Sequence, residues 1–79
     1  MKKMPIAYVM INAEVGKIKQ ILSELKKIDG VIEAYTVAGP YDIIAKLRAE
    51  KFEKVANGVT KGIHKIDGIK NTLTLFAFE

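Results

Sequence analysis

The chain has 79 residues, no cysteine, 49% hydrophobic residues and a net charge of +4. This length suits one domain, 1–79, whose own core is marginal, so surplus apolar surface is expected to face another subunit. Without cysteine the chain has neither disulfides nor thiolate metal sites. No apolar stretch is long enough to span a membrane and no leader pattern is present, so a soluble, cytoplasmic protein is predicted.

The first predicted elements are a strand and a helix. The near-continuous apolar run 6–11, rich in β-branched residues, favours a strand buried on both faces. From Glu14 the spacing changes to the threes and fours of an amphipathic helix that Gly30 caps in a left-handed conformation. Its predicted buried stripe is Val15, Ile18, Ile21, Leu22, Leu25 and Ile28.

A hairpin is predicted next. Strands over 31–37 and 41–48 flank the turn residues Ala-Gly-Pro (38–40), because glycine frees one dihedral angle and proline fixes the next. In the first strand Val31, Glu33, Tyr35 and Val37 are expected on one face. In the second strand Ile43, Ala45 and Leu47 share a face.

A second helix is predicted over 51–66 and a last strand over 69–78. Gly58 and Gly62 lie four residues apart in this helix. Either they let a neighbouring backbone approach the helix closely, or the helix simply tolerates them, and the sequence favours neither alternative. The helix is expected to bury Phe52, Val55, Ala56, Val59, Ile63 and Ile66.

The two halves of the chain share a repeat, which indicates the fold class. Ile-Asp-Gly-Val at 28–31 recurs as Ile-Asp-Gly-Ile at 66–69, at the same helix-to-strand transition. Two β-α-β halves predict a ferredoxin-like α+β fold with a four-stranded antiparallel sheet and two helices on one face. Both phases of the first and last strands are largely apolar, so the open sheet face is expected to be covered by a second copy, giving a homodimer.

Catalytic chemistry finds little support. His64 is the only histidine, on a lysine-flanked helix face, and is interpreted as a solvated surface group. No cluster has metal-ligand spacing and no glycine-rich phosphate loop is present, so no catalytic residue, metal or cofactor is predicted. The chain is expected not to be an enzyme.

One polar constellation remains, formed by Gly39, Tyr41 and Asp42 at the hairpin and Thr72 and Thr74 in the last strand. The Asp42 carboxylate suits an ammonium group, whereas free N–H groups of the turn and the threonine hydroxyls suit a carboxylate. Together they match an amino acid. The alternative, that Asp42 only stabilises the turn and the threonines are ordinary strand residues, stays open.

These segments resemble a known family. Gly-Pro-Tyr-Asp-Ile-Ile (39–44) and Asp-Gly-Ile-Lys-Asn-Thr-Leu-Thr-Leu (67–75) are similar to the RAM domain, the effector-binding domain of Lrp/AsnC transcription regulators. The resemblance covers 7–78. It implies dimers formed through the sheet, octamers or decamers, and amino acid effectors bound between subunits. The five residues named above would line that site.

The resemblance also implies a difference. Regulators of that family carry an N-terminal helix-turn-helix, whereas about five residues precede the first strand here. We therefore expect a stand-alone RAM domain that does not bind DNA directly. It would sense an amino acid or co-assemble with full-length regulators. Two alternatives remain: a nucleic-acid-binding ferredoxin-like protein favoured by the positive charge, and an ACT-type amino-acid-binding domain that dimerises side by side.

Overall fold

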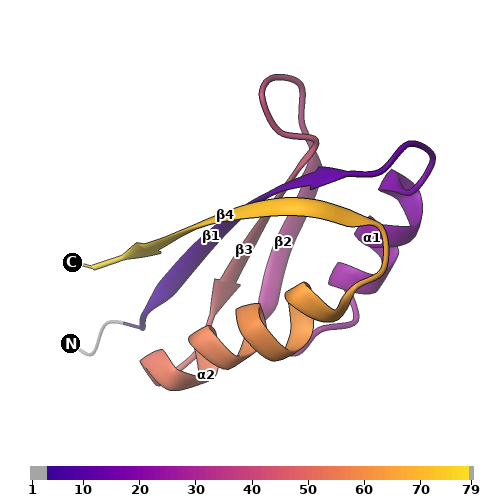
Figure 1. Cartoon of the computed structure of the whole chain (residues 1–79). Helices are drawn as coiled ribbons and strands as arrows, with labels where there is room; N and C mark the ends of the chain where they lie inside the picture. Colours follow the sequence, from indigo (N-terminus) through magenta and orange to yellow (C-terminus); the bar gives the residue numbers. More distant parts are fainter. Residues whose placement is uncertain (1–3, 79) are drawn as a thin grey trace.

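The computed structural model describes residues 4–78 and has the predicted β-α-β-β-α-β order (Figure 1). The strands form one four-stranded sheet in the order β2-β3-β1-β4, with each neighbouring pair antiparallel. Both helices cover the same face of this sheet. The ferredoxin-like α+β fold is thereby confirmed. The elements are β1 (Ile6–Ala13), α1 (Ile18–Leu25), β2 (Val31–Thr36), β3 (Ile43–Arg48), α2 (Phe52–Asn57), η1 (Gly58–Gly62), η2 (Ile63–Lys65) and β4 (Ile69–Ala77).

The core lies between the sheet and the helices. Successive side chains of a strand point to opposite faces, and in β1 and β3 every second residue is buried. The predicted face of β3 is confirmed, since Ile43, Ala45 and Leu47 are almost completely buried. The buried residues contributed by β1 and by the helical layer are Ala7, Val9, Ile11, Ile21, Leu25, Val55, Val59 and Ile63.

The first helix is shorter than predicted. It begins at Ile18, and the predicted burial of Val15 is wrong because this side chain is fully exposed. The segment before the helix is a turn, closed by a 3.0 Å hydrogen bond from the Lys17 N–H to the Glu14 carbonyl and carrying Gly16 at φ 81°. The turn breaks the helical period, so Val15 does not follow the stripe.

The second helical segment is not one regular α-helix. An α-helix over Phe52–Asn57 passes into a π-helical turn over Gly58–Gly62 and a 3₁₀ turn over Ile63–Lys65. The question raised by the two glycines is answered by their neighbours. A Cβ at Gly58 would lie 2.8 Å from Leu47 Cδ2, and one at Gly62 would lie 3.1 Å from Ile28 Cγ2. Their missing side chains let this segment approach β3 and the end of the first helical segment.

Phe52 is not buried as predicted. Its side chain is 46% exposed. Its ring packs at the edge of the helical layer against two aromatic rings from the end of β4, with ring centroids 5.0 Å from Phe76 and 6.0 Å from Phe78. Phe52 therefore covers the sheet edge and does not enter the core.

Strand β2 contains an irregularity that changes its faces. Val31 lies opposite Leu47, whereas Glu33 lies opposite Lys46, with a register shift between Val31 and Glu33. The prediction that these two residues share a face is therefore wrong. Val31 packs against the core, while Glu33 and Tyr35 are exposed on the side of the sheet away from the helices. The extra residue of the bulge reverses the alternation.

Candidate functional site

The β2–β3 loop, residues 37–42, projects beyond the end of the sheet (Figure 1). Its base is closed by a hydrogen bond from the Val37 N–H to the Asp42 carbonyl, 2.9 Å long. Gly39 in the loop has φ 142°, and no atom lies within 4 Å of the position that a Cβ would take there. This combination gives an exposed loop with a firmly closed base and an accessible backbone at its tip.

Asp42 joins the loop to the neighbouring strand. Its N–H donates to the Ile11 carbonyl at 2.9 Å, and its carboxylate Oδ2 accepts the Ala13 N–H at 2.9 Å in a partly buried position. A carboxylate that accepts a backbone N–H makes a charge-assisted bond stronger than a neutral one. Asp42 thus stabilises the fold through contacts with β1 as well as through its contact within the turn. It also places a carboxylate at this end of the sheet.

The two threonines lie on another part of the surface. Thr72 and Thr74 pair with Ile11 and Val9 of β1, whose side chains are buried under the helices, so both threonines belong to the helix-facing side of the edge strand β4. Thr72 Oγ1 lies 3.3 Å from Nε2 of His64. Sequence reasoning did not identify this pair, because nothing in the spacing indicates that a helical residue and a strand residue meet there.

The five predicted site residues therefore form two groups within one chain. Gly39, Tyr41 and Asp42 belong to the hairpin, whereas Thr72 and Thr74 belong to β4. Strand β1 separates the two groups, since it pairs with β3 on one side and with β4 on the other. A ligand that touches both groups within one chain would have to reach across β1.

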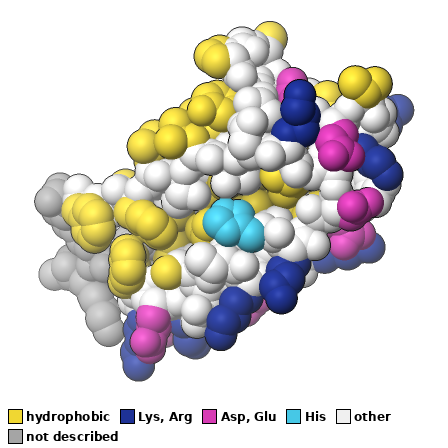
Figure 2. All heavy atoms as spheres, viewed as in Figure 1, with side chains coloured by type: hydrophobic (Ala, Val, Ile, Leu, Met, Phe, Trp, Pro, Cys, Tyr) yellow, Lys and Arg dark blue, Asp and Glu magenta, His cyan; other side chains and the backbone are white. Residues whose placement is uncertain are grey.

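The sheet face away from the helices carries many apolar side chains. Leu73 and Leu75 of β4 are 43% and 49% exposed, and Tyr35 of β2 is 56% exposed. Figure 2 shows hydrophobic side chains gathered on this side of the molecule. The residues of β1, β3 and β4 whose register places them on this face, hereafter the open sheet face, include Ile6, Tyr8, Met10, Ile44, Leu73, Leu75 and Ala77.

A polar cluster interrupts the open sheet face. The Tyr35 hydroxyl donates a hydrogen bond to Glu33 at 3.1 Å, and Lys46 Nζ lies 5.7 Å from the centre of the Tyr8 ring. The hydrogen bond to Glu33, then the negative charge of Glu33 and a small contribution from burial, raise the pKa of Tyr35 above its ordinary value of 10.0. The cluster gives this largely apolar face a few directional contacts.

Within residues 4–78 no helix is long and apolar enough to cross a membrane. Over the same part of the chain no group of three or more histidine or acidic side chains is arranged to hold a metal ion. The geometry thus offers hydrogen-bonding and charged groups of the hairpin and β4, together with an apolar sheet face.

The fold defines a ferredoxin-like α+β domain with an exposed, largely apolar sheet face. The chain belongs to the family described as the Lrp/AsnC ligand binding domain, which matches residues 6–79. An uncharacterised HTH-type transcriptional regulator of Pyrococcus furiosus, PF0250, is 37% identical over 60 residues, 76% of this chain and 40% of that protein. The chain spans less than half the length of the curated relatives that it matches.

Solved structures agree with this family membership. The protein TTHA0845 from Thermus thermophilus superposes with a TM-score of 0.90 and 33% identity, covering 96% of this chain and 95% of that one. Escherichia coli AsnC superposes with a TM-score of 0.85 and 25% identity, over 95% of this chain and 51% of its own length. The same fold thus occurs in a chain of similar length and as about half of a longer chain.

Proposed function

We propose that this domain is a non-enzymatic regulatory module that self-associates and binds a small effector of the amino acid class between subunits. The observation that carries the proposal is the open sheet face, which leaves Leu73, Leu75 and Tyr35 about half exposed. Burying apolar surface contributes about 25 cal/mol per Å², so two such faces gain by stacking on each other. Membership of a ligand-binding family supports the second half of the proposal.

The proposed effector site uses both groups of polar residues. Gly39, Tyr41 and Asp42 of one subunit would meet Thr72 and Thr74 of another in the further assembly of dimers, because the two threonines lie on the helix-facing side of β4 and not on the open sheet face. The Asp42 carboxylate would receive the ammonium group of the effector, because an ionised acceptor makes short, strong hydrogen bonds. The threonine hydroxyls and the exposed N–H groups of the loop would hold the effector's carboxylate. The exposed position of Gly39 supports this arrangement, since a neighbouring molecule can approach its backbone closely.

The proposed partners follow from the same surfaces. We expect a homodimer through the open sheet face, further assembly into octamers or decamers, and co-assembly with full-length Lrp/AsnC regulators. In residues 4–78 strands separate the two helical segments and both segments pack on the sheet, which supports our proposal that this domain acts through its partners and does not bind DNA directly.

The test is a thermal-shift series with each of the twenty amino acids, with the mass in solution measured by light scattering. An effector at a hundred times its dissociation constant stabilises the folded state by about 2.7 kcal/mol, which raises the Tm of a domain this small by on the order of 10 °C. We expect such a rise for one or a few amino acids, on a particle larger than a monomer.

The variant Asp42→Asn sharpens this test. It keeps an oxygen that can accept the Ala13 N–H but removes the negative charge, so the effector shift is expected to disappear while the fold remains. Asp67→Asn is the matched control, since Asp67 is an exposed acid whose side chain contacts Lys17 at 3.8 Å. The proposed site is refuted if Asp42→Asn keeps the full shift. The proposed function fails if no amino acid shifts the Tm of the wild-type protein.

A further inference from the structure

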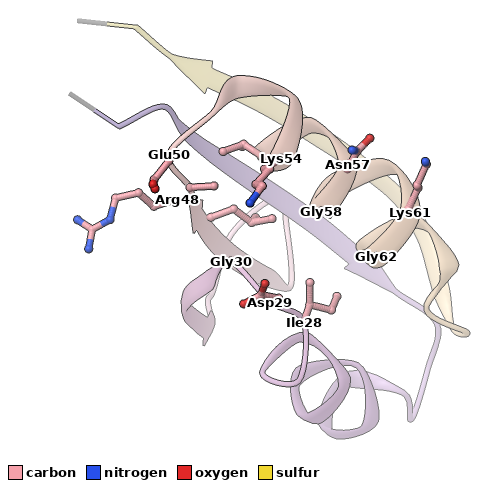
Figure 3. A pocket seen from close by; sticks show the side chains of 13 residues that line it. Ile28, Asp29, Gly30, Arg48, Glu50, Lys54, Asn57, Gly58, Lys61 and Gly62 are labelled. Carbon is pink, nitrogen blue, oxygen red and sulfur yellow. The ribbon is translucent and has the colours of Figure 1, made fainter. Parts of the chain in front are cut away.

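A second concave surface lies at the other end of the sheet from Asp42. It is a cavity of about 530 Å³ between β3, the segment after α1 and the helical segment α2–η1 (Figure 3). Asp42 and Arg48 stand at opposite ends of β3, and at about 3.3 Å per residue the two ends are about 20 Å apart. We name this surface the α2 cavity; its lining includes Ile28, Asp29, Gly30, Leu47, Arg48, Glu50, Lys54, Val55, Gly58, Lys61 and Gly62.

The cavity depends on an unusual stretch of backbone. Gly58 and Gly62 line it and bound the π-helical turn η1. Side chains at these positions would press on Leu47 and Ile28, so glycine lets η1 sit close to β3 while a hollow stays open beside it. Single π-helical turns within helices occur frequently at functional sites. The volume also falls in the range of about 300 to 1,000 Å³ that is typical of small-molecule sites.

The charged groups around the cavity indicate what it would bind. Three cations, Arg48, Lys54 and Lys61, and two acids, Asp29 and Glu50, line it. In the described part of the chain, neither acid forms an ion pair with any of these cations. Figure 3 shows the Lys54 amine turned toward the space above Asp29 and Gly30, whereas the side chains of Asn57 and Lys61 turn away.

We propose that the α2 cavity is a second small-molecule site, for an amphoteric compound with an aliphatic body such as an amino acid. Lys54 would bind its anionic group and Asp29 its cationic group, while Ile28, Leu47 and Val55 contact its apolar part. A molecule with both charges satisfies both side chains, whereas a simple anion or cation satisfies one and is repelled by the other. The cavity lies on the helix side of the sheet, so stacking of open sheet faces leaves it accessible.

Amide NMR spectra of the full chain test this inference, because glycine peaks separate the two sites. The amides of Gly58 and Gly62 report on the α2 cavity, and that of Gly39 reports on the hairpin site. Each of the twenty amino acids is added in turn, followed by the amide and the N-acetyl derivative of whichever binds. We expect at least one amino acid to shift the Gly58 and Gly62 peaks. Each derivative, which lacks one of the two charges, should bind about tenfold more weakly or worse.

Two variants and a control complete the experiment. Lys54→Met and Asp29→Asn should each weaken the shifts at Gly58 and Gly62 by about tenfold and leave any shift at Gly39 unchanged. Lys51→Met removes a neighbouring exposed lysine that does not line the cavity and should change neither set. The inference is overturned if no amino acid shifts the Gly58 and Gly62 peaks, or if the shifts survive both variants. The Gly39 amide peak reports only on the proposed effector site. A loss of the shifts at Gly58 and Gly62 can therefore be distinguished from a failure of that site.

Discussion

Asp42 reaches from the start of β3 to the end of β1, where its Oδ2 accepts the Ala13 N–H at 2.9 Å. Its own N–H donates to the Ile11 carbonyl on the same strand. One residue therefore satisfies a backbone donor and a backbone acceptor beside the β-bulge that separates Asn12 from Ala13. Any study of Asp42 as a ligand-binding residue has to separate these contacts from binding.

Replacing Asp42 by alanine and by asparagine separates the two roles. Asp42→Ala leaves the partly buried Ala13 N–H without its acceptor, and we expect the free energy of unfolding to fall by about 1 to 3 kcal/mol. Asp42→Asn keeps an acceptor oxygen and should cost clearly less. Urea unfolding of both variants measures the difference. Equal losses in the two would show that the charge, and not the hydrogen bond to Ala13, stabilises this end of the sheet.

Gly58 should resist replacement by alanine even though it lies in a helical segment. Alanine normally stabilises a helix by about 1 kcal/mol relative to glycine, but here its Cβ would lie 2.8 Å from Leu47 Cδ2. Leu47 is 1% exposed and has little room to move. We expect Gly58→Ala to lower the free energy of unfolding by about 1 to 3 kcal/mol, as overpacked cores do.

A double-mutant cycle identifies the cause of that loss. Leu47→Val shortens the side chain that the new Cβ would touch, so Gly58→Ala should cost less in the Leu47→Val background than in the wild type. Denaturant unfolding of the four proteins gives the coupling energy. Strict additivity would mean that the cost arises elsewhere, for example in the π-helical backbone of η1.

Self-association should depend on Leu75. This residue lies opposite Tyr8 on the open sheet face and is 49% exposed. A glutamate there would be buried without a partner in stacked sheets, which is strongly unfavourable. Leu75→Glu is therefore expected to shift the protein toward monomer in light scattering.

Val15→Glu is the matched control for Leu75→Glu. It makes the same kind of apolar-to-acidic change at a fully exposed turn residue, so the mass in solution should remain that of the wild type. An unchanged mass for Leu75→Glu would exclude the open sheet face as the interface. Loss of association in both variants would point to net charge as the cause.

The Glu33–Tyr35 contact predicts a change in alkaline solution. Its hydrogen bond and negative charge raise the pKa of Tyr35 above 10.0. A group whose pKa is raised on folding contributes stability below its unfolded pKa and loses that contribution as the pH rises through its folded pKa. The effect is thus confined to pH values above about 10.

Absorbance titration of tyrosinate measures this shift. Comparison with Tyr35→Phe assigns the part of the titration that belongs to Tyr35, and this part should occur at lower pH in Glu33→Gln. An unchanged titration curve in Glu33→Gln would mean that the contact is not maintained in solution.

The regular parts of the fold could be predicted because their patterns are local. The alternation of Ile43, Ala45 and Leu47 and the two Asp-Gly steps specify a strand face and two turns, and Gly30 and Gly68 do have φ near 98° and 95°. The exceptions depend on contacts that periodicity does not contain. The bulge between Val31 and Glu33 and the π-helical turn at Gly58 depend on how neighbouring elements fit together.

The candidate site could be predicted only in part. The hairpin group follows from turn chemistry, and the structure gives it a closed base and an exposed tip. That Thr72 and Thr74 face the helices follows from their register with Ile11 and Val9, which the sequence does not specify. The α2 cavity could not be predicted, since its lining comes from three separate segments.

The projecting β2–β3 loop has a consequence for how such domains can diversify. Its base is fixed by the Val37–Asp42 hydrogen bond, and its tip extends past the sheet. Ala38 and Pro40 are exposed, so substitutions there would alter what the domain meets in another molecule while leaving its own core intact, whereas Gly39 at φ 142° is constrained to glycine. Specificity for ligand or subunit can thus change in this loop over evolutionary time at little cost to folding.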